Sequence, residues 1–211
     1  MSGLFLSLKM EKTFKQIIKG CILKIDKIYF SQDTITDQKT KYGERVFCYE
    51  FYHQLRLHQE DFKDLTISGE AVKSNFQFNH LGNNKTPDIL IHNFGTIKNN
   101  EVVIEVKTSK NKDSVLQGLK KDFLTLDLFT ENAHTKIDYK IGIFLLMNFD
   151  LLELLNQNEK IKNDVASIIK KNSRIEVWNI PNPIFNDANL LDDSSIKIYT
   201  NTELKDIFKN Q

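Results

Sequence analysis

Pro87-Asp88-Ile89-Leu90-Ile91-His92 and Asn100-Glu101-Val102-Val103-Ile104-Glu105-Val106-Lys107 are the two stretches of sequence that decide the fold. The first is a short apolar run and the second alternates its side chains, so each predicts a β-strand. Residues two apart on a strand point to the same face, which puts Glu105 and Lys107 together. If the two strands are neighbours in a hairpin, Asp88 reaches the same place. Two carboxylates and an ammonium are therefore predicted to meet at the rim of a sheet.

The residues around these strands predict a mixed sheet flanked by helices, an α/β fold. We expect one domain over residues 1–211, with an N-terminal helical extension (1–41), a core (42–147) and C-terminal helix and strand additions (148–211). The expected helices cover 11–30, 42–57, 113–129, 150–171 with a weak point at 156–158, and 203–208. Further strands are expected within 64–73 and at 140–148, 174–180 and 196–199, and a loop at 31–41.

Glu44 stands out in the expected helix 42–57 because it falls on the apolar face of that helix. The stripe is formed by Phe47, Cys48, Phe51 and Leu55, and Glu44 lies three residues before Phe47. A carboxylate in line with a core-facing stripe is unusual, since burying an unpaired charge is costly. The alternative is that Glu44 only complements the dipole of the first helical turn.

Converging carboxylates repel each other unless a cation lies between them, and hard oxygen ligands favour Mg²⁺ or Mn²⁺. Asp88 and Glu105 are thus the candidate ligands, and Lys107 would orient a water molecule or stabilise charge developing on a phosphate. The alternative is a solvated strand end in which both acids pair with Lys107. Glu70, His92 and Gln117 are weaker candidates, for which a surface or structural role is favoured.

The spacing Pro87-Asp88…Glu105-Val106-Lys107 resembles the PD-(D/E)xK motif of the restriction-endonuclease-like nuclease superfamily. Together with Gly43-Glu44-Arg45 and Gly69-Glu70-Ala71, it is also similar to a group of small, mostly uncharacterised bacterial proteins. The resemblance covers about residues 42–147.

This resemblance implies a restriction-endonuclease-like core and Mg²⁺-dependent hydrolysis of phosphodiester bonds, most naturally in DNA, with Mn²⁺ as a substitute. Asp88, Glu105, Lys107 and Glu44 would be the catalytic residues, with Glu44 as accessory metal ligand. Lys110 and Lys121 would contact nucleic acid. The superfamily also includes members without turnover, so the alternative is an inactive binding subunit of a defence or mobile-element complex.

Composition sets outer limits on function. With 40% hydrophobic and 27% charged residues the chain is typical of a soluble globular protein, and its net charge of +1 gives no overall attraction for nucleic acid. A protein partner or homodimer is therefore compatible with the sequence. No apolar run is long enough for a membrane and no cleavage-site signature follows the N-terminus, so a cytoplasmic location is expected. Cys21 and Cys48 fall in apolar patterns and are expected to be buried rather than zinc ligands.

Overall fold

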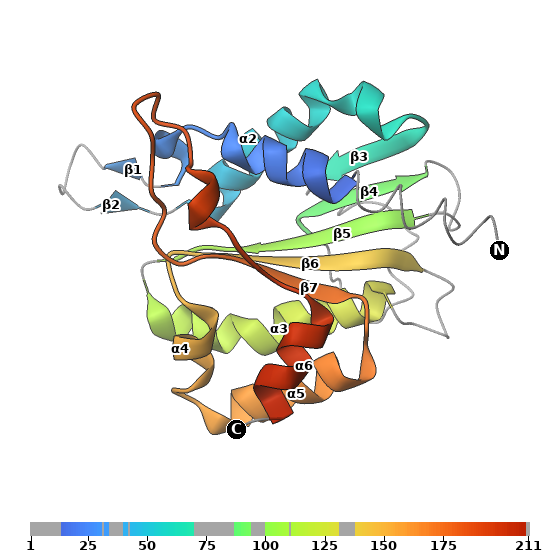
Figure 1. Cartoon of the computed structure of the whole chain (residues 1–211), viewed down its shortest axis with the longest axis vertical. Helices are drawn as coiled ribbons and strands as arrows, with labels where there is room; N and C mark the ends of the chain where they lie inside the picture. Colours follow the sequence, from blue (N-terminus) through green and yellow to red (C-terminus); the bar gives the residue numbers. More distant parts are fainter. Residues whose placement is uncertain are drawn as a thin grey trace.

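The structure is a computed structural model, and it describes residues 14–30, 32–33, 40–41, 43–69, 87–93, 100–109, 111–130 and 138–209. Its centre is one six-stranded mixed sheet with helices on both faces (Figure 1). The α/β fold class expected from the sequence is therefore confirmed. The strands are β3 (Leu65–Gly69), β4 (Ile89–Asn93), β5 (Asn100–Lys107), β6 (Tyr139–Met147), β7 (Ile175–Ile180) and β8 (Lys197–Tyr199).

The strands lie in the sheet in sequence order, from β3 at one edge to β8 at the other. The first three strands are antiparallel neighbours, β5, β6 and β7 run parallel, and β8 returns antiparallel to β7. The parallel strands β6 and β7 are almost wholly buried, because helices cover both of their faces. β4 and β5 form the hairpin that Asp88 and Glu105 need in order to lie close together.

Two groups of helices cover the two faces of the sheet (Figure 1). On one face lie α2 (Glu44–Leu57) and a helix at 14–23, whose apolar side chains share a core with Val102, Ile104 and Val106 of β5. The other face is covered by α3 (Lys112–Thr130), α4 (Leu151–Leu155), α5 (Glu159–Lys171) and α6 (Asn201–Lys209). Val103 of β5 belongs to that second core.

Polar caps explain where several helices start. The expected long helix at 150–171 is two helices, because Asp150 caps α4 and Asn158 caps α5, each through its side-chain oxygen. The expected helix at 11–30 is helical over 14–23 of its described part. It is followed by the 3-10 turn η1 (Lys27–Tyr29), which Asp26 caps by accepting a hydrogen bond from the Ile28 N–H. Helix 14–23 passes through Gly20 without interruption.

The expected loop at 31–41 is corrected in part, since its described residues form a short antiparallel pair, β1 (Gln32–Asp33) and β2 (Thr40–Lys41). The remaining 3-10 turns are η2 (Gln59–Phe62) and η5 (Asp193–Ser195). The chain between β7 and β8 crosses back to the α2 face, where Phe185 packs edge-on against Phe30 with ring centroids 5.2 Å apart. The N-terminal helix and the C-terminal third thus share one core with the sheet.

Cys21 and Cys48 are buried, as the sequence predicted, and Trp178 is buried as well. Within the described ranges, no helix combines the length and the apolar character needed to cross a membrane.

Candidate active site

The register of the β4–β5 hairpin brings Asp88 to Glu105. Ile89 is paired with Ile104, so the residue preceding Ile89 lies opposite the residue following Ile104. The backbone N–H of Val106 donates a 2.7 Å hydrogen bond to Asp88 Oδ2, and the Asp88 and Glu105 carboxyl groups are close enough for each to shift the pKa of the other. The two acids that the sequence placed at neighbouring strand ends therefore do meet.

Burial is the dominant electrostatic feature of this pair. Glu105 is 8% exposed, and burial, followed by the charges of Asp88 and Asp122, raises the pKa of its carboxyl well above the usual range. Burial also raises the pKa of Asp88 to about 6, against the opposing effect of the Val106 N–H. Full ionisation of both groups near pH 7 is thus unfavourable without a compensating cation.

Lys107 lies beside the pair, held between two further carboxylates that come from opposite faces of the sheet. Its Nζ is 3.4 Å from Glu44 Oε2 of α2 and 3.7 Å from Asp122 Oδ2 of α3. Burial alone would lower the pKa of this lysine, but the charges of Asp122 and Glu44 outweigh it and the pKa is raised. Lys107 therefore carries its positive charge at neutral pH.

Gly118 gives the lysine its space on the α3 side. A Cβ added at this glycine would stand 3.0 Å from Lys107 Cε and 3.5 Å from Asp122 Oδ2. A larger residue would therefore make the end of the lysine side chain shift by a few tenths of an ångström, because 3.0 Å is tighter than most Cβ contacts.

Asp122 is the residue of this cluster that the sequence analysis missed. It is 8% exposed, and burial raises the pKa of its carboxyl to about 6 although Lys107 acts to lower it. The distance from its Oδ2 to Lys107 is an ion-pair distance, too long for a hydrogen bond, and this oxygen accepts none from the described residues. A signal was available: Asp122 lies three residues after Leu119 and four before Leu126, on the buried stripe of the helix.

Glu44 occupies the edge of the site rather than its centre. It is the first residue of α2, and its Oε2 accepts a long 3.4 Å hydrogen bond from the Thr108 N–H. Its side chain is 37% exposed and its ion pair is with Lys107. It lies close enough to the buried pair to contribute to the raised pKa of Asp88.

The remaining predicted residues are placed as follows. Lys121 is exposed on α3, and its charge acts to lower the pKa of both Glu105 and Asp122, so it lies near the site. Gln117 is exposed on the same helix. His92 Nε2 lies 2.9 Å from Ser68 Oγ, a side-chain hydrogen bond between β4 and β3 that supports a structural role. Lys110 and Glu70 lie outside the described residues.

The donor set is compatible with a small hard cation. Mg²⁺ typically uses only one or two protein carboxylates and completes its shell with water and substrate oxygens. The Asp88/Glu105 pair has the two carboxylates that such a shell needs. The described part of the chain contains no group of three or more His, Cys, Asp or Glu side chains arranged as a ready metal cage.

Comparison with known proteins finds no matching family model, no similar curated protein and no similar solved structure. Functional inference for this chain accordingly depends on the residues and contacts described above.

Proposed function

We propose that this protein is a metal-dependent nuclease that hydrolyses phosphodiester bonds, with DNA as the expected substrate. The observation that carries the proposal is the meeting of the half-buried Asp88 carboxyl with the buried Glu105 carboxyl, beside a positively charged lysine two residues after Glu105 on the same strand. A purely structural role gives no reason for placing two carboxyls side by side where burial penalises their charged forms. The resemblance of these residues to the PD-(D/E)xK motif supports the same reading.

In this proposal Asp88 and Glu105 hold the cation, Mg²⁺ in the cell or Mn²⁺ as substitute. When bound, such a cation supplies Lewis-acid activation of the phosphate and of water. Lys107 stabilises negative charge that develops on the phosphate, and it is held in place by Glu44 and Asp122. Lys121, exposed beside the site, contacts the substrate backbone, as Lys110 is expected to do.

The second candidate is a nuclease-fold subunit that binds nucleic acid without cutting it. One observation favours it: the ammonium of Lys107 is shared by two carboxylates, which reduces the positive field it offers to a phosphate. The net charge of +1 also fits a chain that binds DNA with help from a protein partner or a second copy.

The deciding experiment incubates the pure protein with plasmid DNA, single-stranded DNA and RNA, each with Mg²⁺, Mn²⁺ or EDTA. The nuclease proposal expects cleavage of at least one substrate that depends on the metal and is lost in Glu105→Ala. Mn²⁺ binding measured by calorimetry without any cleavage would favour the binding subunit. Absence of both would contradict the site itself.

A further inference from the structure

A second polar pocket lies at the other end of the sheet, where β6 and β7 begin. Strand pairing places Glu105 beside Phe144, and the pocket is lined on β6 by Lys140 and Ile141, so this pocket is about 10–13 Å of strand away from the acid pair. Its cavity volume is about 480 Å³. It is lined by Lys140, Ile141, Ser173, Arg174, Glu176, Thr200, Asn201, Thr202, Lys205, Asp206 and Lys209.

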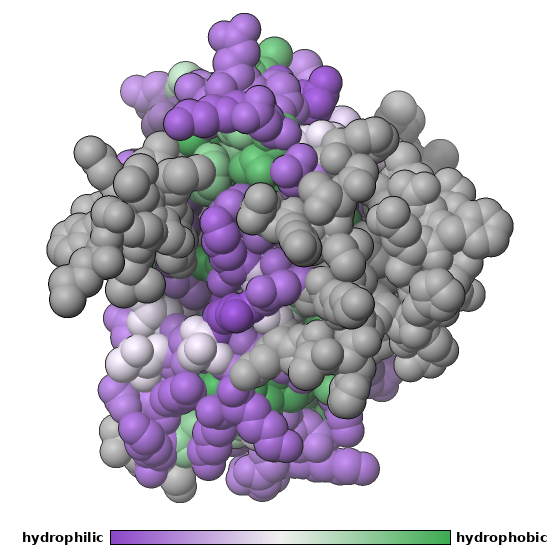
Figure 2. All heavy atoms as spheres, turned by 90° about the vertical axis from the view of Figure 1, so that its right-hand side faces the viewer, coloured by the Kyte–Doolittle hydropathy of each residue, from purple (hydrophilic) through white to green (hydrophobic). Residues whose placement is uncertain are grey.

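Figure 2 looks onto this end of the molecule and shows hydrophilic residues across its middle. Four of the residues that line the pocket are cationic and two are acidic. The positive charge continues onto Lys170 and Lys171, two exposed residues in the last turn of α5. Cationic side chains therefore outnumber acidic ones in the lining of the pocket.

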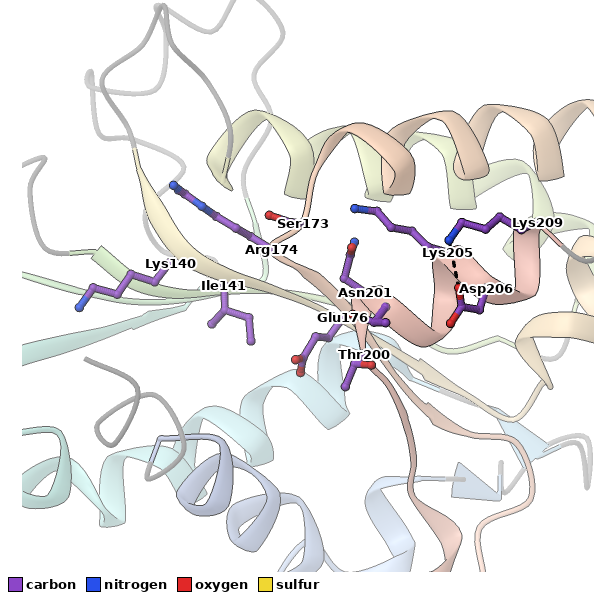
Figure 3. Close-up of a pocket in the computed structure, with 11 residues that line it drawn as sticks. Lys140, Ile141, Ser173, Arg174, Glu176, Thr200, Asn201, Lys205, Asp206 and Lys209 are labelled. Atoms are coloured by element: carbon purple, nitrogen blue, oxygen red, sulfur yellow. Dashed lines mark hydrogen bonds and ion pairs between the residues drawn. The ribbon is translucent and has the colours of Figure 1, made fainter. Parts of the chain in front are cut away.

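Both acids of the lining are already neutralised. Glu176 Oε1 accepts a 2.7 Å ion pair from Lys15, and in Figure 3 its side chain points away from α6. Asp206 is paired with Lys209, its neighbour one helical turn along, at 3.2 Å. Neither carboxylate is therefore free to neutralise a further cation in the pocket.

The cations differ in what holds them. Arg174 is fixed to the framework through Nη1, which donates to the carbonyl oxygens of Thr130 at 2.7 Å and Tyr139 at 3.3 Å and pairs with Asp138. Lys140 is paired with Glu101. Lys205 is half-buried and, among the described residues, makes neither an ion pair nor a hydrogen bond. Figure 3 shows it extending from α6 toward Ser173, alongside Asn201.

Neutral donors complete the lining. Ser173 and Thr202 line the cavity, and Thr202 lies in the first turn of α6, whose start is already capped by the Glu203 carboxylate. Thr200 is tied to Glu203, with its N–H donating to Oε2 at 2.7 Å, so the start of this helix is fixed in place. A lysine without a carboxylate partner in the described part of the chain, together with two hydroxyl-bearing side chains, provides groups of the kind that bind phosphate.

We propose that this pocket binds a small molecule of nucleotide size that carries a phosphate monoester, with Lys205 as its principal charged contact. The volume lies within the range of about 300–1,000 Å³ found for ligand pockets. Ser173 and Thr202 donate to phosphate oxygens, and the remaining cavity between β6 and α6 takes the rest of the ligand. The inference is independent of the nuclease proposal, because the two sites share no residue.

The test measures binding of AMP, of inorganic phosphate and of an oligonucleotide without terminal phosphate to the full chain by calorimetry. EDTA is present throughout, so that no phosphate is held through a metal at Asp88 and Glu105. Lys205→Glu is compared with Lys160→Glu, which makes the same charge change. Lys160 is an exposed lysine near the start of α5, at the end opposite Lys170 and Lys171. Lys205 and Lys160 are both at surface-accessible helix positions, and circular dichroism checks that each variant is folded.

We expect saturable binding of AMP that Lys205→Glu weakens on the order of 10- to 100-fold, the usual worth of a hydrogen bond to a charged group. Lys160→Glu and Glu105→Gln should leave it within about 2-fold, as expected for sites that share no contact. If both lysine variants weakened AMP binding equally, the effect would be one of nonspecific electrostatics, and the proposal would be overturned. Binding of only the unphosphorylated oligonucleotide, which would make the pocket a contact for backbone diesters, would overturn it as well, and so would no binding of any probe.

Discussion

Lys107 and Asp122 form an ion pair at 3.7 Å between the end of β5 and the middle of α3, across a gap that only a glycine at 118 leaves open. Strand and helix are thereby tied at the point where the proposed chemistry takes place. Glu44 approaches the same ammonium from α2 on the opposite face of the sheet. β5, α2 and α3 together thus determine the position of the Lys107 ammonium. Its role can be tested by changing Lys107 itself or by changing a residue that positions it.

The direct test contrasts Lys107→Ala with Glu105→Ala. Lysine is no metal ligand while protonated, so Lys107→Ala should retain Mn²⁺ binding and reduce cleavage on the order of 10²- to 10³-fold, as for loss of one group that stabilises developing charge. Glu105→Ala should abolish both, because it removes a ligand. Calorimetry and single-turnover cleavage measure the two quantities. Equal loss of metal binding in both variants would show that Lys107 supports the fold of the site rather than its chemistry.

An indirect test uses Gly118→Ala. The added methyl group displaces the flexible end of Lys107, so cleavage should fall by about 10-fold or more, since small misplacements of a catalytic group are costly. The same change should raise helix stability by up to about 1 kcal/mol, because alanine is the better helix former. Unfolding by urea and the cleavage rate are the two measurements.

Gly20→Ala is the matched control for that variant, since an added Cβ there meets nothing within 4 Å. It should stabilise its helix by a similar amount and leave cleavage unchanged. If both glycine variants cleave like the original protein, the placement of Lys107 by α3 has no part in the reaction.

The hairpin and its acids were accessible from the sequence because local patterns determine them. Alternation along β5 fixes the face shared by Glu105 and Lys107, and a hairpin of β4 and β5 brings Asp88 opposite Glu105. Asp122 was missed because its helix was read for its apolar stripe alone. The test that singled out Glu44, a carboxylate in line with buried residues, applies equally to Asp122 and identifies it.

Other features had no local signal. The chain between β7 and β8 crosses to the α2 face to place Phe185 against Phe30, and nothing in its own residues specifies which face it covers. The weak point expected at 156–158 indicated where the long helix could divide into α4 and α5. The group that starts α5 there is the side chain of Asn158, which acts as a cap. The pocket at the start of β6 and β7 combines residues distant in sequence, so it depended on the tertiary structure.

The raised pKa values predict an unusual pH dependence of stability for the metal-free protein. The pKa of Asp88 and that of Asp122 are each about 6 in the folded chain, above their ordinary value of 3.8. A carboxyl whose pKa is higher in the folded than in the unfolded chain binds its proton more tightly in the folded state. Its contribution to the free energy of unfolding is therefore present at low pH and is lost as the pH rises through 6. In EDTA, the free energy of unfolding should thus be greater at pH 5 than at pH 7.5, by on the order of 1 kcal/mol per group.

Urea unfolding at the two pH values measures this difference, and Asp88→Asn should reduce it by removing one of the two groups. Mn²⁺ should stabilise the protein more at pH 7.5 than at pH 5, because metal and protons compete for the same oxygens. A free energy of unfolding that does not change over this pH interval would show that folding does not raise the pKa values of Asp88 and Asp122 in the metal-free protein.

The last prediction concerns Glu44, for which the sequence left a metal-site role and a helix-dipole role open. Its carboxylate meets Lys107 and the Thr108 N–H, and Gly43 before it supplies no side-chain cap to α2. If Glu44 serves the site, Glu44→Gln, which keeps the shape and removes the charge, should weaken Mn²⁺ binding and reduce cleavage with little change in stability. If it serves only the helix dipole, the loss should appear in the free energy of unfolding, by about 0.3–1 kcal/mol, with metal affinity unchanged. Glu50→Gln, on the same helix but outside the site, is the control. Calorimetric titration with Mn²⁺ alongside urea unfolding separates the two roles, because each predicts a change in the quantity that the other leaves constant.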